Sequence, residues 1–297
     1  MKNAISYYYN ITADVIHQTE KTFKFTSNKE NYILTPCDRE DIESVYELSC
    51  ELIKRGVLCH QIILNNSNLI ITIINDIPYV LMKILVDDIK IKLNDIIIFN
   101  NIIINSKLDN LRRDNWFKLW CEKIDYFEYQ INQIGKKYPI IRESFSYYVG
   151  LAEIGISLFK NTNKIERLSI SHRRVLYEQS LIELYNPLNL IIDLRIRDTC
   201  EYLKSCFFNN IDILPTIKIY VSNLDETEKI LFLSRMLYPS YYFDVYEKII
   251  SGKTDENELK KIISKVDDYE LFLRNLYFIL KDNNFPNIEF LNKNLLN

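Results

Sequence analysis

Glycine is scarce in this sequence: 297 residues contain only five, where an average usage of roughly 7% would supply about 20. Phosphate-binding loops of the Walker, dinucleotide-binding and protein-kinase types are all built on glycine, because a residue without a side chain lets the backbone approach a phosphate. The composition therefore excludes the common glycine-rich nucleotide-binding motifs. It names no function by itself.

An excess of charge of one sign and a long apolar run are also absent. The 37 Lys and Arg residues nearly balance 40 Asp and Glu residues, for a net charge of −3, so a dedicated nucleic-acid binder is not expected. The strongest apolar stretches, 77–86 and 96–104, are too short to span a bilayer. Residues 1–10 show no basic segment followed by an apolar one, as a secretory signal would require. We expect a cytoplasmic protein without a membrane span.

The sequence also lacks the ligand spacing of a structural metal site. Its six cysteines are scattered with no C-x-x-C pair, and there are only three histidines. Structural zinc sites need closely spaced ligand pairs. We expect buried or half-buried thiols in a reducing compartment and no structural metal.

The first third of the chain reads as strands around one helix. Residues 22–26 alternate apolar and polar side chains, and an apolar run at 32–34 follows a polar turn, which predicts two paired strands. Asp38 and Asp41 indicate a helix start, helical spacing continues to about residue 53, and Gly56 supplies the stop. A hairpin is predicted for 62–64 and 69–74, and a further strand for 79–85.

From about residue 90 the periodicity is helical, interrupted by two short strand-like runs at 168–170 and 190–192. Helices are predicted at 116–134, 144–159, 198–208, 226–237, 241–250, 256–265 and 267–281. The predicted class is α+β: a bilobal, protein-kinase-like fold with a small antiparallel-sheet N-lobe carrying one helix (1–86) and a larger helical C-lobe (87–297).

Three segments carry a closer resemblance to a known family. They are residues 143–153 (ESFSYYVGLAE), 192–203 (IDLRIRDTCEYL) and 233–239 (LSRMLYP). Their order and spacing resemble the YutH-type spore-coat proteins, within the CotS-like group of endospore-forming bacteria. The resemblance implies an aminoglycoside-phosphotransferase-like scaffold, spore-coat proteins as partners, and synthesis in the mother cell with deposition on the spore coat.

Phosphoryl transfer on this scaffold needs a phosphate cover, a strand lysine, a catalytic-loop Asp with an Asn a few residues on, and a magnesium-binding Asp. Residues 11–25, where the cover belongs, contain no glycine. The strand lysine position holds Thr35, and the one alternative cation is Lys24 on the preceding strand.

The catalytic loop maps to residues 171–174, where the active pattern is His-x-Asp. His172 is present, but Arg174 stands where the base belongs, and a guanidinium cannot accept a proton at physiological pH. The metal-binding Asn is replaced by Gln179. We interpret His172 as a structural loop residue, so the sequence offers no confident catalytic residue.

Two acids remain. Asp193 follows the apolar run 190–192 at the place of the magnesium-binding Asp, so it is either a weak metal candidate or an acid paired with one of Arg174, Arg195 and Arg197. Asp198 is interpreted as structural, opening a helix and bracing the catalytic loop.

The predicted function is that of a non-catalytic kinase-like protein (a pseudokinase) of the endospore coat, acting through protein contacts during sporulation and needing no cofactor. The alternative is an active small-molecule phosphotransferase with ATP and magnesium, Asp193 as metal ligand and Glu178 or Glu183 as base. A third reading is a soluble α+β protein outside this family.

The 21 tyrosines, with a run at Tyr7, Tyr8 and Tyr9, are either core residues or partner contacts. The oligomeric state is not predicted.

Overall fold

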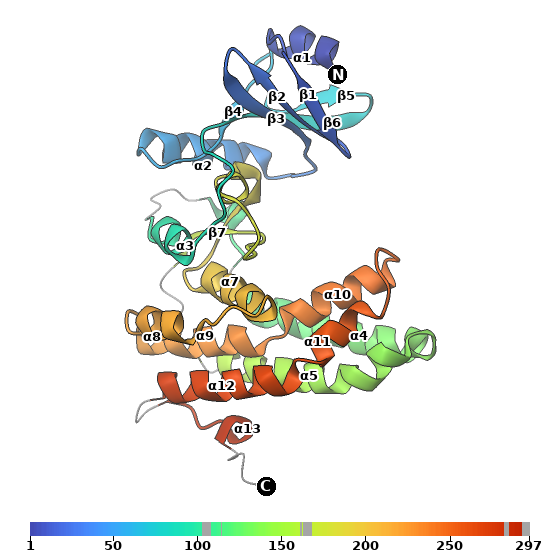
Figure 1. Cartoon of the computed structure of the whole chain (residues 1–297), viewed down its shortest axis with the longest axis vertical. Helices are drawn as coiled ribbons and strands as arrows, with labels where there is room; N and C mark the ends of the chain where they lie inside the picture. The colour runs from blue at the N-terminus through green and yellow to red at the C-terminus, as the bar shows by residue number, and fades with distance from the viewer. Residues whose placement is uncertain (103–107, 114, 161, 163–167, 282–284, 293–297) are drawn as a thin grey trace. The chain divides into compact units, whose positions relative to one another are not determined.

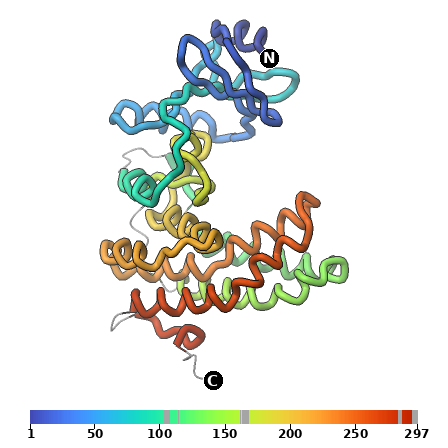
Figure 2. The backbone as a smooth tube through the Cα atoms, in the orientation of Figure 1, coloured from blue at the N-terminus to red at the C-terminus, as the bar shows by residue number. Residues whose placement is uncertain are grey.

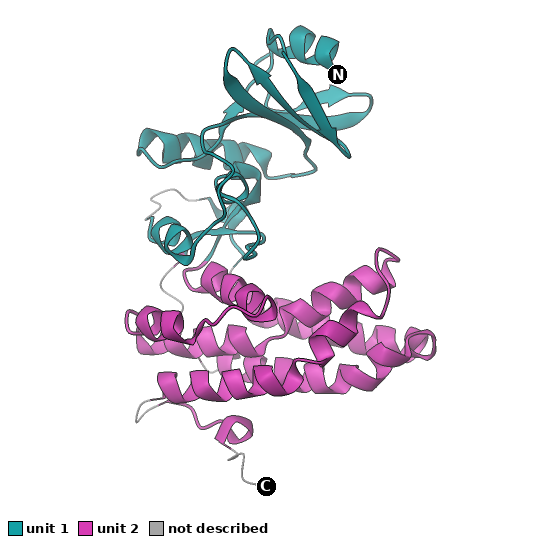
Figure 3. Cartoon of the chain, viewed as in Figure 1, with its two compact units in different colours: residues 1–113, 169–193 teal, residues 114–168, 194–297 magenta. Residues whose placement is uncertain are grey.

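The computed structural model describes residues 1–102, 108–113, 115–160, 162, 168–281 and 285–292. The chain divides into two compact units (Figure 3). Unit 1 comprises residues 1–113 and 169–193, and unit 2 comprises 114–168 and 194–297. The trace in Figure 2 leaves unit 1 after residue 113, returns at 169 and leaves again after 193. The division at residue 86 follows secondary structure and stays a prediction; packing groups residues 87–113 and 169–193 with the sheet.

The core of unit 1 is a six-stranded antiparallel sheet. Its strands are β1 (Ile16–Thr19), β2 (Thr22–Ser27), β3 (Glu30–Pro36), β4 (Gln61–Ile63), β5 (Thr72–Ile74) and β6 (Ile77–Ile84). The order is β1-β2-β3-β6-β4, with β5 also paired to β6. Two-residue turns at Asn28-Lys29 and Asn75-Asp76 have positive φ at both positions, the conformation that matches the twist of a hairpin.

Helices lie on both sides of this sheet (Figure 1). On one side, α1 (Lys2–Tyr9) buries Ile5 and Tyr9 against a cluster that includes Phe25 and Leu34, and the Tyr9 hydroxyl donates to Thr72 Oγ1 over 2.8 Å. On the other side lies α2 (Ile42–Lys54), which confirms the helix predicted there. The sequence analysis did not predict α1, because the helix lacks acidic residues in its first turn and a side-chain cap. Packing against the sheet stabilises it instead.

The predicted hairpin at 62–64 and 69–74 is wrong. Both β4 and β5 pair with β6, at successive positions along the same strand. The buried Asn65 side chain organises the connection: its Oδ1 accepts from the amides of Ser67 and Leu69, and its Nδ2 donates to Thr72 Oγ1. These bonds turn the chain after β4, so that β5 does not pair with β4. The chain then reverses at Asn75-Asp76, and β5 pairs with β6.

The rest of unit 1 follows the sheet. It contains α3 (Leu93–Asn100), the 3-10 turns η1 (Asp109–Leu111) and η3 (Pro187–Asn189), α6 (Leu181–Leu184), and a two-stranded sheet of β7 (Leu168–His172) and β8 (Leu190–Leu194). The first residue of β7, Leu168, and the last residue of β8, Leu194, belong to unit 2. The two short strand-like runs predicted from sequence are confirmed.

Unit 2 is helical. Its helices are α4 (Trp116–Ile134), α5 (Pro139–Lys160), α7 (Arg197–Phe208), α8 (Leu214–Val221), α9 (Glu226–Leu237), α10 (Ser240–Ile250), α11 (Glu258–Ile263), α12 (Val266–Leu280) and α13 (Glu289–Asn292), with the 3-10 turn η2 (Gly135–Lys137). The predicted apolar face of α4 buries Trp120, Ile124 and Phe127. At the crossing of α5 and α9, Ser234 Oγ donates to the Gly155 carbonyl over 2.7 Å.

Four of the six cysteines and ten of the 21 tyrosines are buried. Cys37, Cys59, Cys200 and Cys206 are buried free thiols, and Cys50 and Cys121 are half-buried. In the Tyr7–Tyr9 run, Tyr7 is 75% exposed while Tyr9 is buried, so the run offers one exposed ring and not three. None of the helices in the described part of the chain combines the length and the apolarity needed to cross a bilayer.

Candidate functional site

The loop between β7 and β8 holds the positions at which a kinase-like protein carries its catalytic residues. The amide of Arg173 donates to the Asn189 carbonyl over 2.8 Å, and Asn189 Nδ2 donates to the Arg174 carbonyl over 3.1 Å. All five residues of β8 are buried. The two ends of the loop are therefore held together, and the segment between them is presented from a buried two-stranded base.

His172 supports this loop from inside. Its ring is fully buried, lies 4.9 Å from the ring of Phe99 between centroids, and has Nε2 2.7 Å from the Leu184 carbonyl. A carbonyl oxygen can only accept, so Nε2 carries the proton and donates. The geometry gives His172 contacts that fix the loop, consistent with the structural interpretation from sequence.

The other residues of the predicted catalytic loop do not form a proton-transfer site. Arg174 is exposed. Gln179 Oε1 accepts from the Leu176 amide over 2.8 Å, a contact within its own loop. Glu183, one of the alternative bases, accepts from the Ser180 amide over 2.8 Å in a capping box that starts α6. Glu178, the other, is exposed.

Arg39 braces this loop against the start of α2, a role that the sequence analysis missed. Its side chain is 2% exposed and binds both carboxylate oxygens of Asp41, at 2.6 and 2.7 Å. It also donates to the carbonyls of Leu188 and Leu190. The hydrogen bonds from Arg39 lower the pKa of Asp41. Asp41, the second of the two acids that predicted a helix start, is the N-cap residue of α2 but makes no side-chain cap bond and binds Arg39 instead.

On the sheet, the positions for holding a nucleotide are also altered. The strand β3 contains no lysine, and Thr35 Oγ1 lies 3.1 Å from Thr22 Oγ1 across the strand pair. Lys24 pairs with Ile33 on the facing strand and is exposed. The β1–β2 turn consists of Glu20 and Lys21, with Glu20 at φ 54°. A two-residue turn of one acidic and one basic residue stands where the glycine-rich cover belongs.

Asp193 is a fully buried residue of β8. The neighbouring Ile192 is bridged in parallel to Arg112, and its carbonyl accepts from the Arg113 amide over 2.8 Å. Among the described residues, no group of three or more His, Cys, Asp or Glu side chains is arranged to hold a metal ion. With one acid at the metal position, no group of metal ligands around it and no lysine on β3, the described residues do not fit a magnesium nucleotide.

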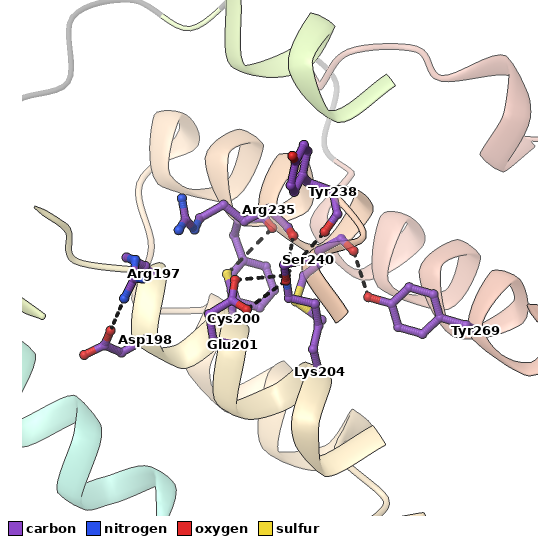
Figure 4. A network of polar contacts seen from close by, with 11 residues as sticks. Arg197, Asp198, Cys200, Glu201, Lys204, Arg235, Tyr238, Ser240 and Tyr269 are labelled. Carbon is purple, nitrogen blue, oxygen red and sulfur yellow. Dashed lines mark hydrogen bonds and ion pairs between the residues drawn. The ribbon is translucent and has the colours of Figure 1, made fainter. Parts of the chain in front are cut away.

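Unit 2 contains a buried polar network that includes Arg197, Asp198 and Arg235 from the motif segments (Figure 4). Asp198 is fully buried in the first turn of α7, and its Oδ1 accepts from Arg197 over 3.2 Å. The N-cap residue of α7 is Ile196, without a side-chain cap bond, so Asp198 lies inside the helix, where a negative charge is favoured by the helix dipole. Arg195 forms a bidentate pair with Glu228 at 2.8 and 2.6 Å.

Two tryptophans cover the arginines of this network. The Arg197 guanidinium lies 5.4 Å from the centroid of the Trp116 ring. The guanidinium of Arg235, a residue of α9, lies 4.5 Å from the same centroid. Arg235 also lies 5.4 Å from Trp120 and is 2% exposed. Cation–π contacts of this kind are stronger when the charge is removed from water. The two arginine motifs are thereby packed against the start of α4.

Further along α7, Lys204 and Glu201 join α7 to the α9–α10 corner (Figure 4). Lys204 Nζ lies 2.9 Å from Glu201 Oε1 and donates to Ser240 Oγ over 2.7 Å and to the Arg235 carbonyl over 3.1 Å. Ser240 Oγ donates to Glu201 Oε2. Burial opposes ionisation of Glu201, but the charges of Lys204, Arg235 and Arg197 lower its pKa to about 2. Glu201 and Arg235, which belong to two of the motif segments, thus lie at a salt-bridged helix junction.

Known proteins are similar to this chain in sequence. The family model described as spore coat putative kinase YutH matches residues 2–276. The endospore coat-associated protein YutH of Bacillus subtilis (strain 168) is 29% identical over 191 residues, which is 54% of this chain and 56% of that relative. The match thus spans about half of the relative's length.

Solved structures show the fold. An aminoglycoside phosphotransferase from Alicyclobacillus acidocaldarius has a TM-score of 0.71 at 12% identity, covering 94% of this chain and 96% of that one. A spectinomycin phosphotransferase has a TM-score of 0.65 at 10% identity, covering 95% and 98%. The predicted aminoglycoside-phosphotransferase-like, α+β fold is confirmed.

Proposed function

The chain belongs to the YutH family of spore-coat proteins, and from that premise we propose that it is a pseudokinase of the endospore coat. It binds other coat proteins and transfers no phosphoryl group. We further propose that it is made in the mother-cell cytoplasm and is deposited on the coat, as the name of its Bacillus subtilis relative supports.

The observation that carries the proposal is Arg174 on the β7–β8 loop. An active kinase-like site accepts the substrate proton on an Asp at this position, and Arg174 stays protonated at any physiological pH. Gln179 adds to this, because it replaces the Asn that helps to hold the metal in an active site. A site without a base and with this Asn replaced is consistent with a scaffold that keeps the fold and has lost the transfer reaction.

A second candidate function keeps the reaction. Asp193 lies on β8, at the place of the magnesium-binding Asp, and is fully buried. An active phosphotransferase would use it as the metal ligand, with the exposed Glu178 as base. The two candidates differ in whether nucleotide binding depends on Asp193.

We expect that ATP or GTP at millimolar concentration, with magnesium, raises the melting temperature of the purified protein by less than about 1 °C, because a ligand stabilises only in proportion to its occupancy. The measurement is a thermal-shift titration with and without magnesium, on the wild type and on Asp193→Asn, which preserves the shape of the buried side chain. A magnesium-dependent shift of several degrees in the wild type that disappears in Asp193→Asn would support the phosphotransferase instead.

A further inference from the structure

A groove outside the candidate site opens on unit 2, between the connection from α7 to α8 and the helix α12. Its volume is about 340 Å³, within the size range of pockets that take a drug-sized group or one or two side chains. It is lined by Phe207, Asn210, Ile211, Asp212, Ile213, Leu214, Lys265, Asp268, Leu271, Phe272 and Asn275. None of these residues belongs to the three motifs.

Packed aromatic rings line part of the groove, which is called its floor below. The rings of Phe207 and Phe272 lie 5.4 Å apart between centroids, and Phe207 also makes an edge contact with Tyr269 at 4.9 Å. Two aliphatic side chains stand at the rim, Ile211 with 39% and Leu271 with 45% of its surface exposed. Exposed aliphatic groups beside the half-buried Phe207 and the buried Phe272 give a partner apolar area to cover.

The wall is already held in place without a ligand. Lys265 Nζ donates to the Phe208 carbonyl over 2.8 Å and to Asn210 Oδ1 over 2.6 Å, which ties the end of α7 to the start of α12. On the α8 side, the Leu214 amide donates to Asp212 Oδ1 over 3.2 Å. A preformed groove loses little conformational entropy on binding.

The charge at the rim is negative. Asp212 and Asp268 are both exposed and line the groove from its two sides. The lining contains one lysine, Lys265, and its ammonium is bound to the Phe208 carbonyl and to Asn210 Oδ1. A partner that enters the groove therefore meets carboxylates around an apolar floor, and a cationic neighbour to its apolar group complements them.

We propose that this groove docks a segment of a partner protein that presents one large apolar side chain next to a lysine or arginine. The apolar group covers Phe207, Leu271 and Phe272, and the cation lies between Asp212 and Asp268. The proposal rests on the scaffold function above and specifies the chemistry of the partner. Its test uses no nucleotide, so its failure and a failure of the pseudokinase proposal are distinguishable.

The test is saturation-transfer NMR of the full chain with three short capped peptides: Gly-Phe-Arg-Gly, Gly-Phe-Glu-Gly and Gly-Ser-Arg-Gly. We expect transfer to the phenylalanine ring of the Phe-Arg peptide at least about fivefold above transfer to the other two. Leu271→Asp is expected to remove it. The double variant Asp212→Lys with Asp268→Lys is expected to reverse the preference, so that the Phe-Glu peptide binds best.

The matched control is Leu119→Asp on α4, since Leu119 is 40% exposed and lies outside the groove. It is expected to leave binding unchanged. No transfer with any peptide overturns the proposal, and so do equal transfer to all three or an equal loss in both leucine variants. Sedimentation velocity on the same samples addresses the other occupant: self-association of the wild type that Leu271→Asp abolishes would assign the groove to a second copy of this chain, and would also overturn the proposal.

Discussion

Replacing Lys204 by methionine is expected to lower the free energy of unfolding by about 3 kcal/mol at neutral pH. Lys204 is buried, with a side chain only 3% exposed, and pairs with Glu201 three residues earlier on α7. Its ammonium also binds the Arg235 carbonyl and Ser240 Oγ. Methionine fills the same space, but leaves the Glu201 carboxylate without its nearest cation, and a poorly compensated charge away from water is costly. Urea unfolding measures the change.

The effect carries a pH signature. The pKa of Glu201 is lowered in the folded state to about 2, below its ordinary value, so the ionised form stabilises the fold. That contribution is fully present above the ordinary carboxyl pKa of about 4.3 and is lost as the pH falls toward 2. Because Lys204 supplies much of the contribution, the difference between wild type and Lys204→Met narrows as the pH falls through this window. A difference independent of pH would contradict the assigned pairing.

The matched control is Lys261→Met on α11. Lys261 pairs with Glu258 at the same three-residue spacing, but its side chain is 75% exposed. A surface pair of this kind contributes little, so we expect a change of no more than about 0.5 kcal/mol. Equal losses in the two variants would show that burial of the Lys204–Glu201 pair is not what matters.

Gly155→Ala is expected to destabilise unit 2 by about 3 kcal/mol, at the upper end of the cost of overpacking. An added Cβ would lie 2.8 Å from the Ser234 carbonyl and 3.3 Å from the Tyr238 amide nitrogen. Both are backbone atoms of the segment that packs against α5, so α5 and α9 would have to move apart. The same movement breaks the bond from Ser234 Oγ to the Gly155 carbonyl. Thermal unfolding with calorimetry measures the loss.

Gly150→Ala, in the same helix, is the control. A Cβ at Gly150 meets no atom within 4 Å, and alanine is favoured over glycine in a helix interior by about 1 kcal/mol. The control is therefore expected to stabilise the protein while Gly155→Ala destabilises it. Two changes of the same sign would refute the close crossing of α5 and α9.

The sequence predicted the parts of the fold that depend on local periodicity. The strand at 22–26, the helix beginning at Ile42 and the amphipathic face of α4 are confirmed, because alternation and helical spacing are properties of one segment. The hairpin at 62–74 was wrong, since both segments pair with β6 and the deciding contacts come from the Asn65 side chain. The helix α1 was missed because the sheet, and not its own sequence, stabilises it.

At the candidate site too, the sequence identified residues but not their contacts with distant segments. Their residues could be picked out from the sequence, and Arg174 and Gln179 already indicated a lost base and a lost metal ligand. The packing of Arg197 and Arg235 on Trp116, and the bond from Lys204 to Ser240, bring together residues of four helices, α4, α7, α9 and α10. No spacing within one segment encodes such contacts. Arg39 could not be found either, since its partners on the β7–β8 loop lie about 150 residues away.

The central claim is that this chain keeps a phosphotransferase fold without the transfer reaction. The most direct measurement is release or transfer of labelled phosphate from γ-labelled ATP by the purified wild type with magnesium, beside Asp193→Asn. We predict that both proteins match the buffer blank, because the position of the base is occupied by a guanidinium. Turnover at least about tenfold above the blank in the wild type, abolished by Asp193→Asn, would contradict the claim.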